Sequence, residues 1–162
     1  MILDKLLEFG DATSVANTAG STYNLGGADN ILVDTSSVAR DLGNGEPVYF
    51  VVTVDTAIVA AGAGSITVSL VSDSTTTIAT DGSATTHLTQ TYTTAATAGG
   101  SAANKTAAGS IMMCAALPSG KTFERYLAVQ YTVTSNNTSA GKINAFLTKD
   151  PTGWAAYADA TN

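Results

Sequence analysis

The stretch 65–70 alternates strictly between apolar and hydroxyl-bearing residues, and this constrains the fold more than any other feature of the chain. Ile66, Val68 and Leu70 alternate with serines and a threonine. A period of two residues is typical of a β-strand with one packed face and one wet face. Residues 48–55 are apolar at nearly every position and rich in β-branched and aromatic side chains, which predicts a strand buried on both faces.

Further strands are predicted downstream and upstream of this pair, at 86–93, 111–117, 123–133 and 142–148, with short elements at 23–25 and 31–33. Glycine, proline, asparagine and serine separate them, as turns require, and 93–110 is expected to be a long exposed loop. About eight strands at this spacing, with no repeat of fixed period, indicate an all-β fold. Two antiparallel sheets packed face to face are the commonest solution.

The two ends differ from the middle. We expect an N-terminal arm over 1–11, a β-sandwich domain over 12–149 and an irregular C-terminal tail over 150–162. The arm is too apolar to stay exposed to water, so we expect it to pack either on its own domain or on a partner. Aromatic residues in the tail either cover the sandwich or anchor a partner. The candidate protein-binding residues are therefore Ile2, Leu3, Leu6, Leu7, Phe9, Trp154 and Tyr157.

Charge and length exclude several partners. The 162-residue chain carries a formal net charge of -6 with only 12% charged residues, and no basic cluster offers the counter-charge that nucleic acid needs. No apolar run approaches the ~20 residues that span a bilayer, so a membrane is not expected as a partner. Acidic residues interrupt the apolar stretch of the N-terminus, which argues against a signal peptide and for synthesis into the cytosol.

No group of residues predicts catalysis, a cofactor or a metal site. Residues 115–122 imitate a phosphate-binding loop, but the following residues alternate as a strand where such a loop needs a helix. His87 is the only histidine, and we expect it to face solvent without a catalytic partner. The single cysteine, Cys114, is expected in the core. We therefore expect a protein that is not an enzyme and that acts by binding other proteins.

Two passages carry a family resemblance. They are the opening Met1-Ile2-Leu3-Asp4-Lys5-Leu6 with Phe9 and Asp11, and the run Arg40-Asp41-Leu42-Gly43-Asn44-Gly45-Glu46-Pro47. The chain resembles the capsid cement (decoration) protein family of short-tailed bacteriophages. The resemblance implies a jelly-roll-like β-sandwich on the exterior of the virion. Such a protein bridges copies of the phage major capsid protein and stabilises the capsid, without enzymatic activity or cofactor.

The resemblance also implies self-association, with a homodimer favoured and a trimer as the alternative, and assembly in the host bacterial cytoplasm. A rival reading is a ligand- or carbohydrate-binding β-sandwich of a virion fibre or surface protein. Sugar sites stack rings on exposed tryptophan or tyrosine, and the aromatic residues of this chain are dispersed.

Overall fold

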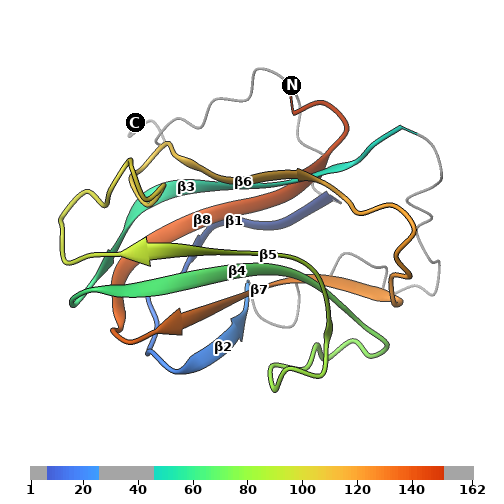
Figure 1. Ribbon diagram of the computed structural model, residues 1–162, viewed down its shortest axis with the longest axis horizontal. Coiled ribbons are helices and arrows are strands. Elements are labelled where there is room, and N and C mark those ends of the chain that lie inside the picture. The colour runs from blue at the N-terminus through green and yellow to red at the C-terminus, as the bar shows by residue number, and fades with distance from the viewer. Residues whose placement is uncertain (1–6, 26–45, 152–162) are drawn as a thin grey trace.

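The computed structural model describes residues 7–25 and 46–151, and these form two packed β-sheets (Figure 1). Within them no helix is long and apolar enough to cross a membrane. The eight strands are β1 (Glu8–Ser14), β2 (Ser21–Asn24), β3 (Tyr49–Ala60), β4 (Gly64–Asp73), β5 (Thr85–Thr94), β6 (Ile111–Ala116), β7 (Tyr126–Thr134) and β8 (Thr138–Thr148). The predicted all-β class is confirmed.

Each sheet has four antiparallel strands. Their orders are β1-β8-β3-β6, which we call sheet A, and β2-β7-β4-β5, which we call sheet B. The first strand therefore pairs with the last, the second with the seventh and the fourth with the fifth, while β3 pairs with both β6 and β8. Two interlocked Greek keys with this order form a jelly roll, so the predicted jelly-roll-like sandwich is confirmed.

The core lies between the sheets and is built by the alternation read from the sequence. Ile66, Val68 and Leu70 of β4 are fully buried against apolar residues of β3, β7 and β8. Ser65, Thr67 and Ser69 of β4 face away from this core. Thr67 and Ser69 bond across to β5, as between Thr67 and Thr91, whose hydroxyl oxygens lie 2.8 Å apart. The sequence pattern therefore set the inner and outer faces of sheet B correctly.

The N-terminal boundary differs from the prediction. Residues 8–11, which we assigned to an arm, belong to β1 and pair with β8. Phe9 is fully buried and packs edge-on against Phe50, with ring centroids 5.9 Å apart. Irregular pairing conceals this strand, because the register shifts twice along it and Ala12 has a φ of 45°. The strand predicted at 31–33 lies outside the described residues.

The loop predicted at 93–110 does connect two strands over residues 95–110, but it is tied down by backbone hydrogen bonds. The Ile58 amide donates to the Thr106 carbonyl over 2.8 Å, and the Thr106 amide donates to the Ser101 carbonyl over 2.9 Å. Gly100 has a φ of +66°, and a Cβ there would lie 2.3 Å from the Thr106 carbonyl oxygen. Only glycine fits this position without displacing the loop.

Candidate interaction site between two edge strands

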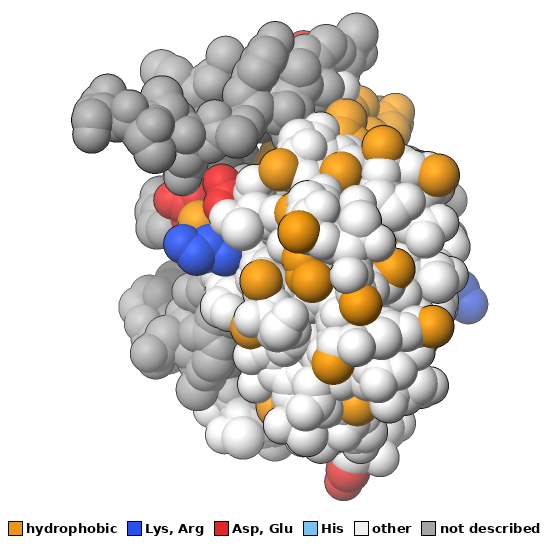
Figure 2. Space-filling model, turned by 90° about the vertical axis from the view of Figure 1, so that its left-hand side faces the viewer, with side chains coloured by type: hydrophobic (Ala, Val, Ile, Leu, Met, Phe, Trp, Pro, Cys, Tyr) orange, Lys and Arg blue, Asp and Glu red, His pale blue; other side chains and the backbone are white. Residues whose placement is uncertain are grey.

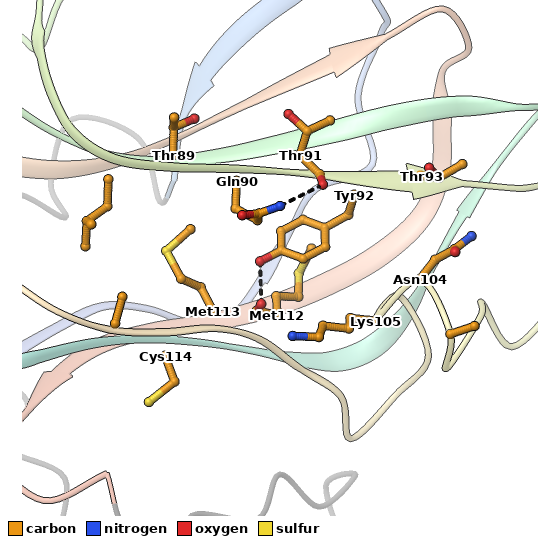
Figure 3. Close-up of a pocket in the computed structure, with 13 residues that line it drawn as sticks. Thr89, Gln90, Thr91, Tyr92, Thr93, Asn104, Lys105, Met112, Met113 and Cys114 are labelled. Atoms are coloured by element: carbon orange, nitrogen blue, oxygen red, sulfur yellow. Dashed lines mark hydrogen bonds between the residues drawn. The ribbon is translucent and has the colours of Figure 1, made fainter.

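A groove runs along the side of the sandwich where β5 ends sheet B and β6 ends sheet A. It has a volume of about 630 Å³ (Figure 3). We call it the edge groove. Strand β5 contributes residues 88–93, the β5–β6 loop contributes residues 103–105, and β6 contributes residues 112–115.

The edge groove has an apolar floor with polar walls. Tyr92 and Met113 point into the space between the sheets, from β5 and β6 respectively (Figure 3). Both are buried, at 7% and 8% exposure, whereas Gln90 is exposed. Methionine side chains adapt their shape to whatever covers them. The floor can therefore accept apolar side chains without having one fixed shape.

Among the described residues that line the edge groove, Lys105 is the only charged one. Its side chain is exposed, and its backbone has a φ of 56°, a left-handed conformation unusual for a residue with a Cβ. The loop enforces this conformation, because the Lys105 amide donates to the Ala102 carbonyl over 3.1 Å. The Ser101 amide donates to the Thr106 hydroxyl over 2.9 Å. The position of this cation is thus built into the loop.

Tyr92 bridges the two sheets at the bottom of the groove. Its hydroxyl donates a hydrogen bond to the Met112 carbonyl on β6 (Figure 3). Burial raises the pKa of Tyr92 to about 12, because the phenolate would lose its hydration there. The hydroxyl is therefore a neutral donor throughout the physiological range.

Cys114 is exposed, which contradicts the prediction that it lies in the core. The pairing of β3 with β6 shifts register between Val52 and Thr53, so that both Met112 and Met113 are buried. Cys114 then points away from Tyr92 (Figure 3). Edge position and alternation together place the thiol outside the core.

His87 packs against other side chains, whereas the sequence predicts that it faces solvent. Its ring stacks on Phe123 with centroids 4.0 Å apart, and its Nε2 lies 2.7 Å from the Ser72 hydroxyl oxygen. That oxygen also accepts the Glu124 amide over 3.0 Å. Burial lowers the pKa of His87, the Glu124 charge opposes this shift, and Lys121 adds to it.

The hydrogen-bonded pair Ser72–His87 has a structural role and not a catalytic one. Ser72 is fully buried, so its hydroxyl is not exposed to a substrate. The Glu124 carboxylate accepts a hydrogen bond from the Thr85 hydroxyl over 2.5 Å. The cluster joins β4, β5 and the segment before β7. Sequence reasoning missed it because the Ser72–Thr85 register, which brings His87 beside Ser72, is a long-range relationship.

Of the predicted protein-binding residues, Leu7 and Phe9 are described. Leu7 is half-buried and packs against the core, and Phe9 is inside it. For these two residues, the alternative in which the segment packs on its own domain holds. The other predicted binding residues, which are Ile2, Leu3, Leu6, Trp154 and Tyr157, lie outside the described residues.

Asp73 at the end of β4 and Asp81 in the β4–β5 loop accept hydrogen bonds from neighbouring residues of the same segment. Hydrogen bonds from the Ala79 and Thr75 amides lower the pKa of Asp73, and bonds from the Ser83 side chain and amide lower the pKa of Asp81. Across residues 7–25 and 46–151, no group of three or more histidine, cysteine, aspartate or glutamate side chains is placed to hold a metal ion.

A second feature lies at the end of the sandwich where the β3–β4, β5–β6 and β7–β8 connections meet. The Ala60 amide donates to the Ala95 carbonyl over 3.2 Å, and the Ala61 amide donates to the Asn137 carbonyl over 3.0 Å. Figure 2 shows this end, with hydrophobic side chains scattered among uncharged polar atoms and charged groups only toward its rim. Exposed alanines here include Ala63 and Ala96.

Comparison with known proteins gives one family. No curated protein matches the chain. The family model described as Bbp16 matches residues 9–147, from β1 to the end of β8. The name suggests a protein of a Bordetella phage. Because the match covers most of the chain and reaches all eight strands of the jelly roll, this chain belongs to the Bbp16 family.

Proposed function

We propose that this protein is a capsid cement (decoration) protein. It binds the outside of a phage head, bridges major capsid protein subunits and stabilises the shell. The observation that carries the proposal is the match of a phage protein family to residues 9–147, which are the complete jelly roll. Double-sheet jelly rolls recur in viral capsid proteins, although a fold by itself does not fix a function.

The surface chemistry supports this role. The end formed by the three loops exposes alanines and uncharged polar groups (Figure 2), and the cores of protein interfaces are depleted in charged residues. The net charge of -6 suits a position outside the shell, because the protein there does not contact packaged DNA. The proposed activity is binding, so no residue is assigned a catalytic role.

Repetition explains how modest contacts would stabilise a head. A symmetric shell offers many equivalent sites, and a subunit that bridges two of them binds the second at high effective concentration. Self-association, as a dimer in preference to a trimer, would add further links. Assembly would take place in the bacterial cytoplasm, where the Cys114 thiol stays reduced.

The test uses phage heads that lack this protein and the purified full-length chain. We expect the chain to co-sediment with heads at saturating occupancy and to raise the temperature at which the heads release DNA. Failure to bind heads, combined with micromolar binding to a glycan array, would replace this proposal with the carbohydrate-binding alternative.

The terminal segments need their own variants. Deletion of residues 2–6 removes the predicted binding residues Ile2, Leu3 and Leu6 and spares Phe9, which the core requires. We expect this deletion and the double variant Trp154→Ala/Tyr157→Ala each to lower head occupancy while the unfolding temperature stays unchanged. Full occupancy by both variants would remove the terminal segments from the interface.

A further inference from the structure

We propose that the edge groove binds an extended segment of the major capsid protein as an additional strand beside β5. The segment carries uncharged side chains and one carboxylate that reaches Lys105. This inference rests on the proposed function, since it names how the shell subunit is held. Four features support it. The two strand edges are free, they lack protective charges, the groove has an apolar floor, and one cation lies beside that floor.

Both walls of the groove are strand edges with open hydrogen-bonding capacity. In the described part of the chain, β5 pairs only with β4, and β6 pairs only with β3. The Thr91 carbonyl accepts a 3.4 Å hydrogen bond from the Gln90 side-chain Nε2, and the Met112 carbonyl accepts one from the Tyr92 hydroxyl. The rest of the outward row of backbone groups on β5 is a template for another strand.

The edge strands on the opposite side of the sandwich are protected against pairing with another strand. There, β1 carries Glu8 and Asp11 and two register shifts, and β2 is only four residues long. Charges, irregular pairing and shortness are the usual means of preventing edge-to-edge association. The ten residues of β5 and the six of β6 include no lysine, arginine, aspartate, glutamate or proline. This side of the molecule is therefore suited to pairing.

The groove floor supplies contacts for every second side chain of an added strand. Side chains of a strand alternate between faces, so a strand beside β5 would direct alternate residues toward Tyr92, Met113 and Ala115. Burial of small or medium apolar side chains against these residues adds affinity to the backbone bonds. The opposite face of the added strand would continue the hydroxyl-bearing surface formed by Thr89 and Thr91.

The cation selects the occupant. Lys105 is the one charged side chain in the described lining of the groove, so a segment with one carboxylate at that end complements it. A second copy of this chain does not. A two-fold contact uses the same patch twice, and this patch would bring a lysine from each copy without supplying an acid for either. A segment of a different protein therefore fits better than a self-contact.

Two charge variants test the binding mode. Lys105→Glu reverses the cation in the groove, and the matched control Lys121→Glu makes the same change in an exposed loop outside it. We expect Lys105→Glu to bind heads about tenfold more weakly and Lys121→Glu to bind like the wild type. If both variants bind like the wild type, the groove inference is overturned while the proposed function stands. If the wild type does not bind, the proposed function itself fails.

Thiol labelling tests occupancy directly. In a Cys114→Ala background, Gln90→Cys places the only thiol in the groove, and Ser119→Cys places it on an exposed loop as the control. Binding to heads is expected to slow maleimide labelling of the Gln90→Cys protein at least tenfold and leave the Ser119→Cys protein unaffected. Equal labelling of the Gln90→Cys protein, free and bound, would overturn the inference. Protection already in the head-free protein would assign the groove to a second copy and overturn it as well.

Discussion

The Tyr92 hydroxyl of β5 donates a hydrogen bond to the Met112 carbonyl of β6 and so joins the open edges of the two sheets (Figure 3). Such a bond is local in space and remote in sequence. It keeps the floor of the edge groove closed while the strand edges above it stay free, which makes it a support for the site as well as for the fold.

Removal of that hydroxyl should measure its contribution to stability. Tyr92→Phe leaves the Met112 carbonyl without this donor, and we expect the free energy of unfolding in urea to fall by about 1–2 kcal/mol. Tyr23→Phe is the control, because the Tyr23 hydroxyl bonds the Thr18 carbonyl at an exposed position over 3.2 Å. A loss from Tyr92→Phe no larger than that from Tyr23→Phe would show that the bridge contributes little.

The same tyrosine should destabilise the protein in alkali. Its pKa is raised to about 12 in the folded state by burial, against 10.0 as its ordinary value. Its contribution is therefore complete below pH 10 and is lost as the pH rises from 10 to about 12. Unfolding free energies measured across this window should fall more steeply for the wild type than for Tyr92→Phe. Parallel curves for the two proteins would contradict this assignment.

His87 should make the fold acid-sensitive. Its pKa is lowered in the folded state mainly by burial, so the unfolded chain binds the proton more readily. Stability is then complete above pH 6.5 and declines as the pH falls below the ordinary histidine value. We expect the decline between pH 7 and 5 to be smaller in His87→Gln. A midpoint above 6.5 in an NMR titration of the imidazole would be the opposite of the expected result.

The two glycine positions Gly100 and Gly82 should respond differently to alanine. Both have positive φ, but a Cβ at Gly100 would meet the Thr106 carbonyl, whereas no atom of the described residues lies within 4 Å of one at Gly82. We expect Gly82→Ala to cost about 1–2 kcal/mol for the left-handed backbone alone, and Gly100→Ala to cost more. Thermal unfolding of both variants checks the order. Equal losses would mean that the loop yields to the added methyl group.

Substitution of Phe9 distinguishes a role in the core from a role in binding. Phe9→Ala should lower the free energy of unfolding by about 3–5 kcal/mol, because it leaves a cavity beside Phe50. Leu7→Ala, at a half-buried position, should lower it by much less. Chemical denaturation of both variants is the measurement. A stable Phe9→Ala protein that no longer binds heads would return Phe9 to the interface.

Local patterns predicted most of the fold. Strict alternation located β4, because a half-buried strand repeats its pattern every two residues. A continuous apolar run located β3, because that pattern is typical of a strand buried on both faces. The same reasoning missed β1, since the irregular pairing around Ala12 breaks that period. It also misplaced Cys114, because the register shift before Met113 changes which residues of β6 face inward.

The edge groove could not be predicted from local patterns. It exists because β5 and β6 both end their sheets on the same side, and the order of strands depends on pairing between distant segments. One sequence signal was nevertheless available. Lys105 is the only charged residue in the sixteen positions 95–110, in a stretch otherwise made of small and polar residues. A single cation in such a loop indicates a specific binding role more than a general contribution to solubility.

The pairing of the first strand with the last affects how the chain is made. Strand β8 lies between β1 and β3, so the described strands of sheet A remain two unconnected parts until β8 has left the ribosome. Long-range closure of this kind slows folding. Meanwhile the uncharged β5 edge is already exposed, so newly made chains are at risk of sticking to one another at high rates of synthesis. The yield of folded protein would then depend on how quickly each chain completes β8.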